Sequence, residues 1–559
     1  MKFDEALEHL GEFGWYQKRL YFVLCILTCI VALQNQAVIF QLDTPDHRCS
    51  LGVNDTYQVQ DAHHSSLINM SIPWETDRDK QVLSSCKMYQ YPQNGSQPNN
   101  LTTPCNAWVF DKSTYESTLT EKFSIVCDDL VLRSHSYMAG FAGQMAGALV
   151  MGLLSDLFGR RPLVLISSVA KAIVTIGMAF VPNVHVYIAF RVLECVCGGA
   201  AFTSTLVLML ELTGPSRRVF VAIIMEIFWC FSQFALGLIA YFVRNWQHLQ
   251  LITSFPSALS ILCYWLVPES PRWLIARGRK PEAQKIMQKM AYVNGVECSD
   301  NIVENITLIN DKQKPVKITQ MFTTPYLLFI TVIIFFNWFV ASLAYYGLNL
   351  NVQNLSGNIY INFTISNTVE LVSYITCMLL LDRLGRKFVQ CGCLLLGGIA
   401  CVCTMFPVIY GKSSSDWVTV VLAMLGKLGA SGTFATVYVY TAELFPTVIR
   451  NSGLGVSSFF ARIGGMVSPY IADLGVLLGG DLKVALPLIV FGGLSIAAGL
   501  LTLFLPETLK RRLPETIEDA KNMRKKCPKT KSLLHTETTN VEMESCQRRA
   551  CLLEPTEQT

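Results

Sequence analysis

Charged residues are scarce in this chain. Only 15% of its 559 residues are Asp, Glu, Lys or Arg, whereas 51% are hydrophobic. Soluble domains carry about 25% charged residues, so this composition excludes a soluble protein of this length. The formal net charge of +4 is also small, and it gives no reason to expect a nucleic-acid partner.

The sequence also lacks the marks of an enzyme and of a cleaved leader. The dipeptide Gly426-Lys427 has no upstream glycine of a phosphate-binding loop, and no catalytic triad or metal-binding constellation stands out. We therefore expect no enzymatic activity, no cofactor and no metal. Residues 1–18 contain four acidic residues and no apolar core, so the first hydrophobic segment is expected to act as an uncleaved signal anchor.

One short signature is present in two copies. It reads Asp-Leu-Phe-Gly-Arg-Arg over residues 156–161 and Asp-Arg-Leu-Gly-Arg-Lys over residues 382–387. Two further landmarks recur in the same order and at nearly the same spacing: Glu211-Leu212 recurs as Glu443-Leu444, and Pro268-Glu269 recurs as Pro506-Glu507. Three repeated landmarks indicate a duplicated half, the architecture of many secondary transporters.

Twelve segments are long and apolar enough to span a bilayer, which takes about 20 residues each. They are residues 19–41, 133–154, 162–181, 186–208, 218–241, 246–267, 326–348, 358–381, 388–409, 416–440, 449–472 and 483–505. Six precede the polar stretch 268–325 and six follow it. We therefore predict an all-α membrane protein with the major facilitator fold, built from two six-helix halves.

The basic residues predict the orientation. Residues 268–325 contain nine Lys and Arg and the stretch from residue 506 contains eleven, whereas the short loops of the other face carry almost none. Because basic loops stay in the cytosol, both termini should be cytoplasmic. The predicted parts are a cytoplasmic N-terminus (1–18), two halves (19–267 and 326–505), a central cytoplasmic loop (268–325) and a cytoplasmic tail (506–559).

The stretch 42–132 is then extracellular, between the first two spans. Its four cysteines predict two disulfides with three alternative pairings, and they are Cys49, Cys86, Cys105 and Cys127. It also contains four N-glycosylation sequons, at Asn54, Asn69, Asn94 and Asn100. We expect a disulfide-bonded, glycosylated outer loop.

Charged residues of the repeated landmarks can form a gate. Asp156 can pair with Arg160, with Arg161 or with charges on the neighbouring bundle, and such contacts would hold the cytoplasmic face closed and break when the halves rock. The alternative is that the arginines only enforce topology. A second acid–base pairing, of Glu211 with Arg217 or Arg218 and of Glu443 with Arg450, is repeated in both halves and favours the gate. The predicted gate residues are Asp156, Arg160, Arg161, Glu211, Arg218, Asp382, Arg386, Glu443 and Arg450.

Ionisable residues inside a predicted span are costly and usually face a cavity or an internal partner. They are Lys171, Arg191, Glu194, Glu226, Glu370, Lys427 and Arg462. Glu370 and Arg462 lie near the middle of their spans, which favours a substrate site. For Lys171, Arg191, Glu194 and Lys427 an internal ion pair is an equal alternative.

Aromatic side chains share helical faces with polar ones. One face carries Trp338, Ser342, Tyr345 and Asn349, with Tyr346 beside it, and another carries Glu226, Trp229 and Gln233. An aromatic wall with a carboxylate can hold a quaternary ammonium through cation–π and Coulomb attraction. The alternative, that these stripes only pack the core, stays open.

Longer motifs identify a family. They are Pro-Glu-Ser-Pro-Arg-Trp-Leu over 268–274, Thr-Ala-Glu-Leu-Phe-Pro-Thr-Val-Ile-Arg-Asn over 441–451 and Leu-Pro-Glu-Thr over 505–508. With the large first outer loop, they resemble the organic cation/carnitine (organic ion) transporter family of the major facilitator superfamily. Sugar porters resemble the chain in the first motif but lack so large an outer loop.

The resemblance also implies site residues. In the cation branch an aspartate precedes the Ile-Gly-Gly of span 11, whereas Arg462 stands here, as in the anion and carnitine branches. Anion transporters add a lysine four residues after the span 8 acid, Glu370, whereas Tyr374 resembles the carnitine branch. The aromatic residues that the family uses map to Phe202, Trp338 and Tyr345. Val372 departs from the family, which has proline there.

We therefore expect a plasma-membrane transporter of small organic cations and zwitterions such as carnitine. The predicted substrate-binding residues are Arg462, Glu370, Trp338, Tyr345, Tyr346, Glu226, Trp229, Phe202 and Tyr374. Arg462 would bind a carboxylate, and Glu370 with the aromatic residues would bind the cationic head. Coupling to Na+ or H+ stays open, with Glu443 a candidate by resemblance. The alternatives are an organic anion exchanger and a scaffold that does not transport.

Overall fold

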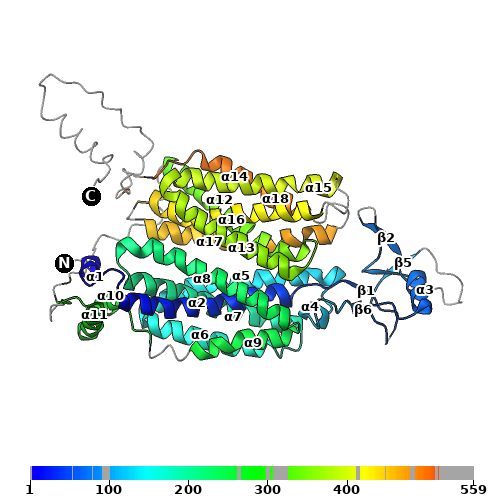
Figure 1. Ribbon diagram of the computed structural model, residues 1–559, viewed down its shortest axis with the longest axis horizontal. Coiled ribbons are helices and arrows are strands. Elements are labelled where there is room, and N and C mark those ends of the chain that lie inside the picture. Colours follow the sequence, from blue (N-terminus) through cyan, green and yellow to red (C-terminus); the bar gives the residue numbers. More distant parts are fainter. Residues whose placement is uncertain are drawn as a thin grey trace, which may run out of the picture.

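The computed structural model of the chain is a bundle of long helices with a small strand-containing segment at one end (Figure 1). It describes residues 3–52, 54–77, 80–90, 101–260, 266–297, 302–304, 306, 325–410, 416–446, 449–478, 485–509 and 514. The predicted sequons Asn94 and Asn100 and most of the stretches 298–324 and 510–559 lie outside the described residues.

The long helices follow the predicted spans. In chain order they are α2 (Trp15–Gln41), α5 (Val131–Phe158), α6 (Arg160–Met178), α7 (Val184–Leu212), α8 (Arg218–Phe242), α9 (Trp246–Leu259), α12 (Pro325–Asn351), α13 (Ile359–Leu384), α14 (Arg386–Cys403), α16 (Asp416–Leu444), α17 (Arg450–Leu478) and α18 (Ala485–Thr502). We call α2 and α5–α9 the first half and α12–α18 the second half. Figure 1 shows the first half below the second.

Ten helices among the described residues are long and apolar enough to cross a membrane, so the prediction of a multi-span helical protein is confirmed for ten of its twelve spans. The other two are α9 and α17. Helix α9 is described for 14 residues only. Helix α17 has 29 residues and is long enough to cross a membrane. It carries Arg462 and Asp473, however, and its mean hydropathy is too low for it to count as a candidate span.

The predicted span 388–409 is broken. Helix α14 ends at Cys403, and a separate helix α15 (Met405–Tyr410) follows. Pro407 explains the break, because proline has no N–H to donate to the carbonyl of Cys403 and its ring clashes with that carbonyl. At the break, the hydroxyl of Thr404 donates a hydrogen bond to the carbonyl of Cys401 at 2.6 Å.

We call the end of the bundle with the strands the loop end. Six short strands lie there, β1 (His47–Cys49), β2 (Trp74–Asp77), β3 (Lys80–Leu83), β4 (Lys87–Tyr89), β5 (Thr102–Pro104) and β6 (Trp108–Phe110), with α3 (Ala62–Ser71) and α4 (Leu119–Lys122). They form three antiparallel pairs, β1 with β6, β2 with β3 and β4 with β5. The predicted outer loop is therefore a small folded unit.

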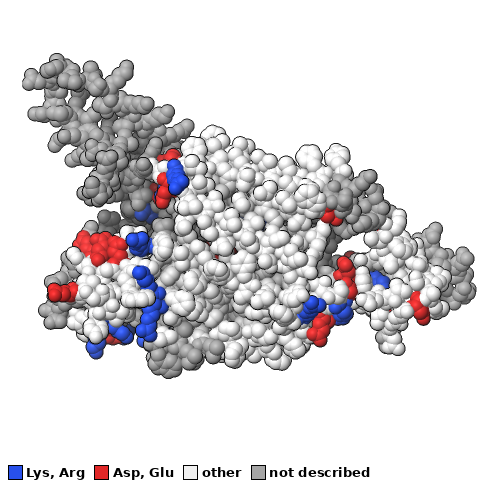
Figure 2. Space-filling view, viewed as in Figure 1, with Lys and Arg blue, Asp and Glu red and all other residues white. Residues whose placement is uncertain are grey.

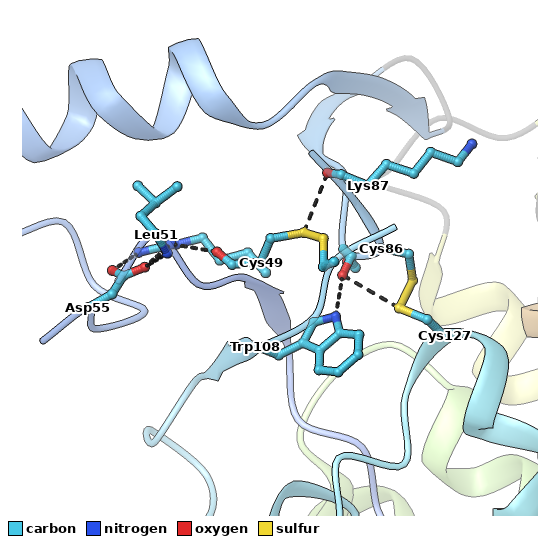
Figure 3. The surroundings of a disulfide bond; sticks show 10 residues. Cys49, Leu51, Asp55, Cys86, Lys87, Trp108 and Cys127 are labelled. Carbon is cyan, nitrogen blue, oxygen red and sulfur yellow. Dashed lines mark hydrogen bonds and ion pairs between the residues drawn. A yellow bond between two sulfur atoms is a disulfide. The ribbon is translucent and has the colours of Figure 1, made fainter. Parts of the chain in front are cut away.

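Two disulfides tie this unit together. Cys49 is bonded to Cys105 and Cys86 to Cys127, which selects one of the three pairings that the sequence leaves open. Figure 3 shows Trp108 beneath the two bridges, where its indole N–H donates to the carbonyl of Ser85 at 3.2 Å. The second bridge joins the unit to the start of α5 through Cys127.

The opposite end, which we call the motif end, carries α1 (Phe3–His9), α10 (Pro271–Ala276) and α11 (Lys280–Asn294) (Figure 1). Trp273 of α10 donates from its indole nitrogen to the carbonyl of Asp156 at 2.9 Å, so the repeated signature lies at this end. Figure 2 shows Lys, Arg, Asp and Glu gathered at the two ends of the visible face, with an almost uncharged band between them. Such a band suits the hydrocarbon core of a bilayer.

The two halves meet along two helix pairs, α5 with α17 and α8 with α13. Within the first half, α5 packs closely on α7 because Gly143 and Gly147 have no side chain there. A Cβ atom at either glycine would collide with the backbone of Val192 or Val196. Small residues allow such close helix contacts in membrane proteins. The halves thus pack internally and leave a central space at their interface.

Candidate substrate site and gates

A central cavity of about 100 Å³ lies between the two halves. It is lined by Val31, Asn35, Gln144, Ala148, Lys171, Cys195, Gly198, Gly199, Phe202, Thr203, Glu226 and Trp229 of the first half and by Tyr345, Tyr346, Tyr374, Phe434, Tyr438 and Arg462 of the second. This volume holds several water molecules. The walls combine aromatic rings with three charged side chains, so the cavity suits a small organic ion.

The structure brings seven of the nine predicted substrate-binding residues to this cavity. They are Arg462, Glu226, Trp229, Phe202, Tyr345, Tyr346 and Tyr374. Glu370 and Trp338 do not line it. Both are completely buried one layer behind the wall, in the second half. The indole nitrogen of Trp338 donates to the hydroxyl of Thr441 at 2.8 Å.

Arg462 enters the cavity from α17. Its Nη1 donates to Oε1 of Gln144 across the interface at 3.2 Å, and Nε2 of Gln144 donates in turn to Oδ1 of Asn35, also at 3.2 Å. Its Nε is buried and has no hydrogen-bond partner among the described residues. Because a buried N–H without an acceptor is costly, this guanidinium is suited to receive an anionic group.

Glu226 enters the cavity from α8 on the opposite half. No described residue forms a hydrogen bond or an ion pair with its carboxylate. Trp229, one helical turn further, stacks edge-to-face on Phe202 with ring centroids 5.7 Å apart. The first half thus offers an unpaired carboxylate next to aromatic rings, the combination that binds an organic ammonium.

Aromatic rings line the other wall. Tyr345 stacks on Phe434 with centroids 5.0 Å apart, and Tyr346 meets Tyr345 edge-to-face at 5.1 Å. Tyr346 also contacts Phe141 of the first half at 4.6 Å. Tyr345 and Tyr346 come from α12 and Phe434 from α16, so the predicted aromatic face of span 7 does reach the cavity at Tyr345 and Tyr346.

Glu370 has an internal partner. Its Oε2 lies 2.8 Å from Nζ of Lys427, and its Oε1 accepts hydrogen bonds from the hydroxyls of Tyr345 and Tyr374 at 2.7 and 3.1 Å. The internal ion pair that the sequence allows for Lys427 is therefore formed. The sequence carries these opposite charges inside two different spans, but it does not show which helices lie side by side.

A second buried ion cluster lies in the first half. Nη1 of Arg191 lies 2.5 Å from Oε2 of Glu194, and Nζ of Lys171 lies 3.9 Å from Oε1 of the same carboxylate. The internal pairing that the sequence allows for these three residues is thus also formed. Lys171 nevertheless lines the cavity, so this cluster presents one cation there.

The motif end carries two matching ion networks. In the first half Arg160 contacts Glu211 at 3.1 Å and Asp156 at 2.9 Å. In the second half Arg386 contacts Glu443 at 3.0 Å and Asp382 at 3.2 Å. The repeated landmarks of the sequence therefore form the same structure twice.

Among the described residues, the close ion pairs predicted for Glu211 with Arg217 or Arg218, and for Glu443 with Arg450, are replaced by other partners. The 3-10 turn η2 (Pro215–Arg217) intervenes, and Arg218 instead contacts Asp4 of α1 at 2.7 Å. Arg450 donates from Nε to the carbonyl of Phe445 at 3.4 Å. The glutamates take Arg160 and Arg386 because those arginines start the neighbouring helices α6 and α14.

Glu269 and Glu507 complete the networks, a role that the sequence analysis missed. Glu269 accepts the backbone N–H groups of Arg160 and Arg161 at 3.0 and 3.3 Å. Glu507 accepts those of Arg386 and Lys387 at 3.0 and 3.2 Å. Each carboxylate thus caps the positive N-terminus of a helix. The repeat of Pro268-Glu269 as Pro506-Glu507 was the signal.

The turns that present these helix starts depend on glycine. Gly159 and Gly385 have φ of +103° and +95°, values that residues with a Cβ rarely adopt. The ion pairs of Arg160 and of Arg386 each join residues of one half, so these two networks do not link the halves in this conformation.

The loop end joins the halves by a buried ion pair. Arg133 of α5 contacts Asp473 of α17, and their side chains are 3% and 6% exposed. The hydroxyl of Ser134 donates to Oδ2 of Asp473 at 2.6 Å. Gln353 donates to the hydroxyl of Tyr137 at 3.2 Å. Asp473 lies one residue beyond the predicted end of span 11, which is why the sequence analysis missed it.

Comparison with known proteins is consistent with these features. The family model described as sugar (and other) transporter matches residues 92–519. An organic cation transporter protein of Drosophila melanogaster is 37% identical over 543 residues, which cover 94% of this chain and 96% of the relative. Solute carrier family 22 member 1 of Oryctolagus cuniculus is 33% identical over 561 residues (97% and 99%), and member 4 of Mus musculus is 33% identical over 545 residues (93% and 95%).

Solved structures show the same fold. The inward open conformation of the xylose transporter XylE from E. coli matches with a TM-score of 0.59 and 15% identity, covering 91% of this chain and 99% of that one. Its partially occluded inward open conformation also gives a TM-score of 0.59, with 16% identity over 88% and 98% of the two chains. The predicted major facilitator fold is thus confirmed. The chain is a multi-pass membrane protein that belongs to the organic ion transporter family, solute carrier family 22, a family of transporters and not of enzymes.

Proposed function

We propose that this protein is a plasma-membrane secondary transporter that moves small organic cations and zwitterions such as carnitine by alternating access. One observation carries the proposal. The cavity between the halves is lined by an unpaired carboxylate, Glu226, by a guanidinium with an unsatisfied N–H, Arg462, and by aromatic rings. The names of the relatives, which include organic cation transporters, support the cationic part of the proposal.

The two ends of a zwitterion would bind to opposite halves. A substrate carboxylate would accept hydrogen bonds from Arg462 and displace Gln144 from it. The cationic head would lie between Glu226 and the rings of Tyr345 and Tyr346. Trp229, Phe202 and Tyr374 would line the site. Glu370 and Trp338 would act from behind the wall, by holding Tyr345 and α16 in place.

Transport would follow from rocking of the halves around this site. In this proposal the buried pair of Arg133 and Asp473 seals the loop end in the described conformation. Opening of that end would separate this pair and would bring the two motif-end networks together. In this proposal the predicted gate residues keep the motif end of each half rigid, and these two rigid surfaces come into contact when that end closes.

We propose that the loop end faces outward and that both termini are cytoplasmic, as the distribution of Lys and Arg favours. The outer unit would then carry glycans at Asn54 and Asn69, whose side chains are exposed. Its two disulfides suit an oxidising compartment.

A second candidate function is organic anion exchange, which two observations favour. Glu370 is neutralised by Lys427, and Lys171 adds a second cation to the cavity wall beside Arg462. Two cations and one carboxylate would attract an anion as well as a zwitterion.

Uptake into cells that express the chain distinguishes these functions. Labelled carnitine, tetraethylammonium and para-aminohippurate are compared with and without Na+ and at two pH values. Arg462→Ala is measured alongside at matched surface expression. The proposal predicts carnitine uptake that the variant loses, with tetraethylammonium uptake retained. Uptake of para-aminohippurate alone would instead establish the anion exchanger.

A further inference from the structure

The ammonium of Lys427 is held by the same groups that would hold an organic cation. It comes from α16 and is almost completely buried. Its Nζ lies 2.8 Å from a carboxylate oxygen of Glu370 and 4.2 Å from the centroid of the Tyr345 ring. It also donates a hydrogen bond to the side-chain carbonyl of Asn349.

These contacts are of three kinds: a carboxylate, an aromatic face and an amide oxygen. A carboxylate and an aromatic face are the two groups that bind ammonium ligands in proteins. We call the site formed by Glu370, Tyr345 and Asn349 the second-half pocket. Because the ammonium of Lys427 comes from the chain itself, this pocket already holds a cation. Both oxygens of the Glu370 carboxylate have a partner, since Oε2 forms the ion pair with Lys427 and Oε1 accepts the hydroxyls of Tyr345 and Tyr374.

Only a layer of tyrosine side chains separates this pocket from the central cavity. Tyr345 and Tyr374 line the cavity and also contact Glu370, whereas Glu370 and Lys427 do not line it. If the ammonium of Lys427 were absent, a cation in the cavity would need to pass only these two rings to reach Glu370. The second half would then have a cation site of its own.

We propose that Lys427 determines substrate specificity, as a tethered cation that occupies and neutralises the cation site of the second half. The cation of a substrate is thereby confined to Glu226 in the first half, while Arg462 is left as the charged group of the second half. The cavity then favours cargo with a carboxylate at one end over simple organic cations. This inference rests on the proposed function of the cavity as the substrate site.

Two substitutions separate the charge of Lys427 from its volume. Lys427→Ala removes the ammonium and leaves room for an ammonium ligand beside Glu370. Lys427→Met removes only the charge and fills the space. The matched control is the double variant Lys427→Ala with Glu370→Gln, which has the room but no carboxylate.

Binding of tetraethylammonium to the purified full-length protein is the primary measurement, because it does not depend on transport. We expect Lys427→Ala to bind it at least tenfold more tightly than the wild type. Lys427→Met should gain less, and the double variant should return to the wild-type affinity. In cells, the ratio of tetraethylammonium to carnitine uptake should rise in the same order.

An unchanged or weaker affinity of Lys427→Ala for tetraethylammonium would overturn the inference, and so would a gain that persists in the double variant. If Lys427→Ala does not fold, Lys427→Met with and without Glu370→Gln takes its place: a smaller gain in tetraethylammonium affinity that Glu370→Gln removes supports the inference, and an unchanged affinity overturns it. A wild type that takes up none of the three probes would contradict the proposed function, but it would leave the binding comparison intact. The two failures are thus distinguishable.

Discussion

Replacement of Asp473 by asparagine should open the loop end. Arg133 and Asp473 join α5 to α17 and are almost completely buried. Removal of one partner from a buried ion pair leaves an uncompensated charge and costs about 3–5 kcal/mol. The cost falls on the sealed conformation, because Arg133 regains water when the halves separate there.

At about 1.4 kcal/mol per tenfold change, a cost of about 3 kcal/mol shifts the equilibrium about 100-fold toward the conformation that is open at the loop end. Cys195 reports on this shift, because it lines the central cavity. A membrane-impermeant thiol reagent added on the loop side should therefore modify Cys195 up to about 100-fold faster in Asp473→Asn. Cys195→Ser in both backgrounds identifies the part of the signal that comes from this residue.

Glu121→Gln is a matched control, because Glu121 pairs with Lys112 at the same end of the molecule but on its surface. A surface pair contributes about 0–1 kcal/mol, so labelling should change little. Equal labelling of Cys195 in Asp473→Asn and in the wild type would refute the assignment of the Arg133–Asp473 pair as the seal of the loop end.

Three further predictions concern other parts of the molecule. Burial raises the pKa of Asp43 to about 6, against the opposing effects of Tyr115 and Arg133, whereas its unperturbed pKa is about 3.9. Protonation of Asp43 therefore stabilises the sealed loop end, fully below pH about 4 and progressively less as the pH rises through 6. The rate of Cys195 labelling, corrected for thiol ionisation, should fall at pH 5, and Asp43→Asn should remove this pH dependence. Replacement of both Cys86 and Cys127 by serine should cost about 2–5 kcal/mol in the outer unit and lower the surface expression measured by antibody labelling, and normal expression would contradict a stabilising role of this bridge. Glu269→Gln should weaken the cap of α6 by about 1 kcal/mol and lower the melting temperature of the purified protein. Glu282→Gln, whose carboxylate lies half exposed in the first turn of α11 and pairs with Arg279, should lower it less.

The positions of the helices could be predicted because the bilayer demands long apolar segments. The exceptions have local causes. Pro407 breaks α14 from α15, and Arg462 and Asp473 make α17 more polar than the other long helices. The strands of the outer unit could not be predicted in the same way, because they are only three or four residues long and depend on the two disulfides.

The candidate site was predictable in composition but not in its pairings. Arg462 and Glu226 could be found because an ionisable residue inside a span needs a cavity or a partner. Whether such a residue faces a cavity or an internal partner depends on which helix packs beside it. Glu370 and Lys427 come from different helices, and only packing shows that they meet. The same is true of Glu211, whose partner Arg160 starts the neighbouring helix.

The central claim is that Glu226 and Arg462 bind the two ends of one zwitterion. The most direct test is the Kd of carnitine for the purified wild type and for Glu226→Gln, Arg462→Gln and the double variant, with tetraethylammonium and para-aminohippurate as single-charge probes. Arg462 would donate hydrogen bonds to the carboxylate of carnitine, and since a hydrogen bond to a charged group contributes about 1.5–3 kcal/mol, Arg462→Gln should weaken carnitine binding about 10- to 150-fold. The trimethylammonium of carnitine has no N–H, so Glu226 would attract it by charge alone. At about 5 Å and an effective dielectric constant of about 20 this attraction is about 3 kcal/mol, so Glu226→Gln should weaken carnitine binding about 100-fold. Tetraethylammonium should respond to Glu226→Gln alone and para-aminohippurate to Arg462→Gln alone. Unchanged carnitine binding in both single variants would contradict the account.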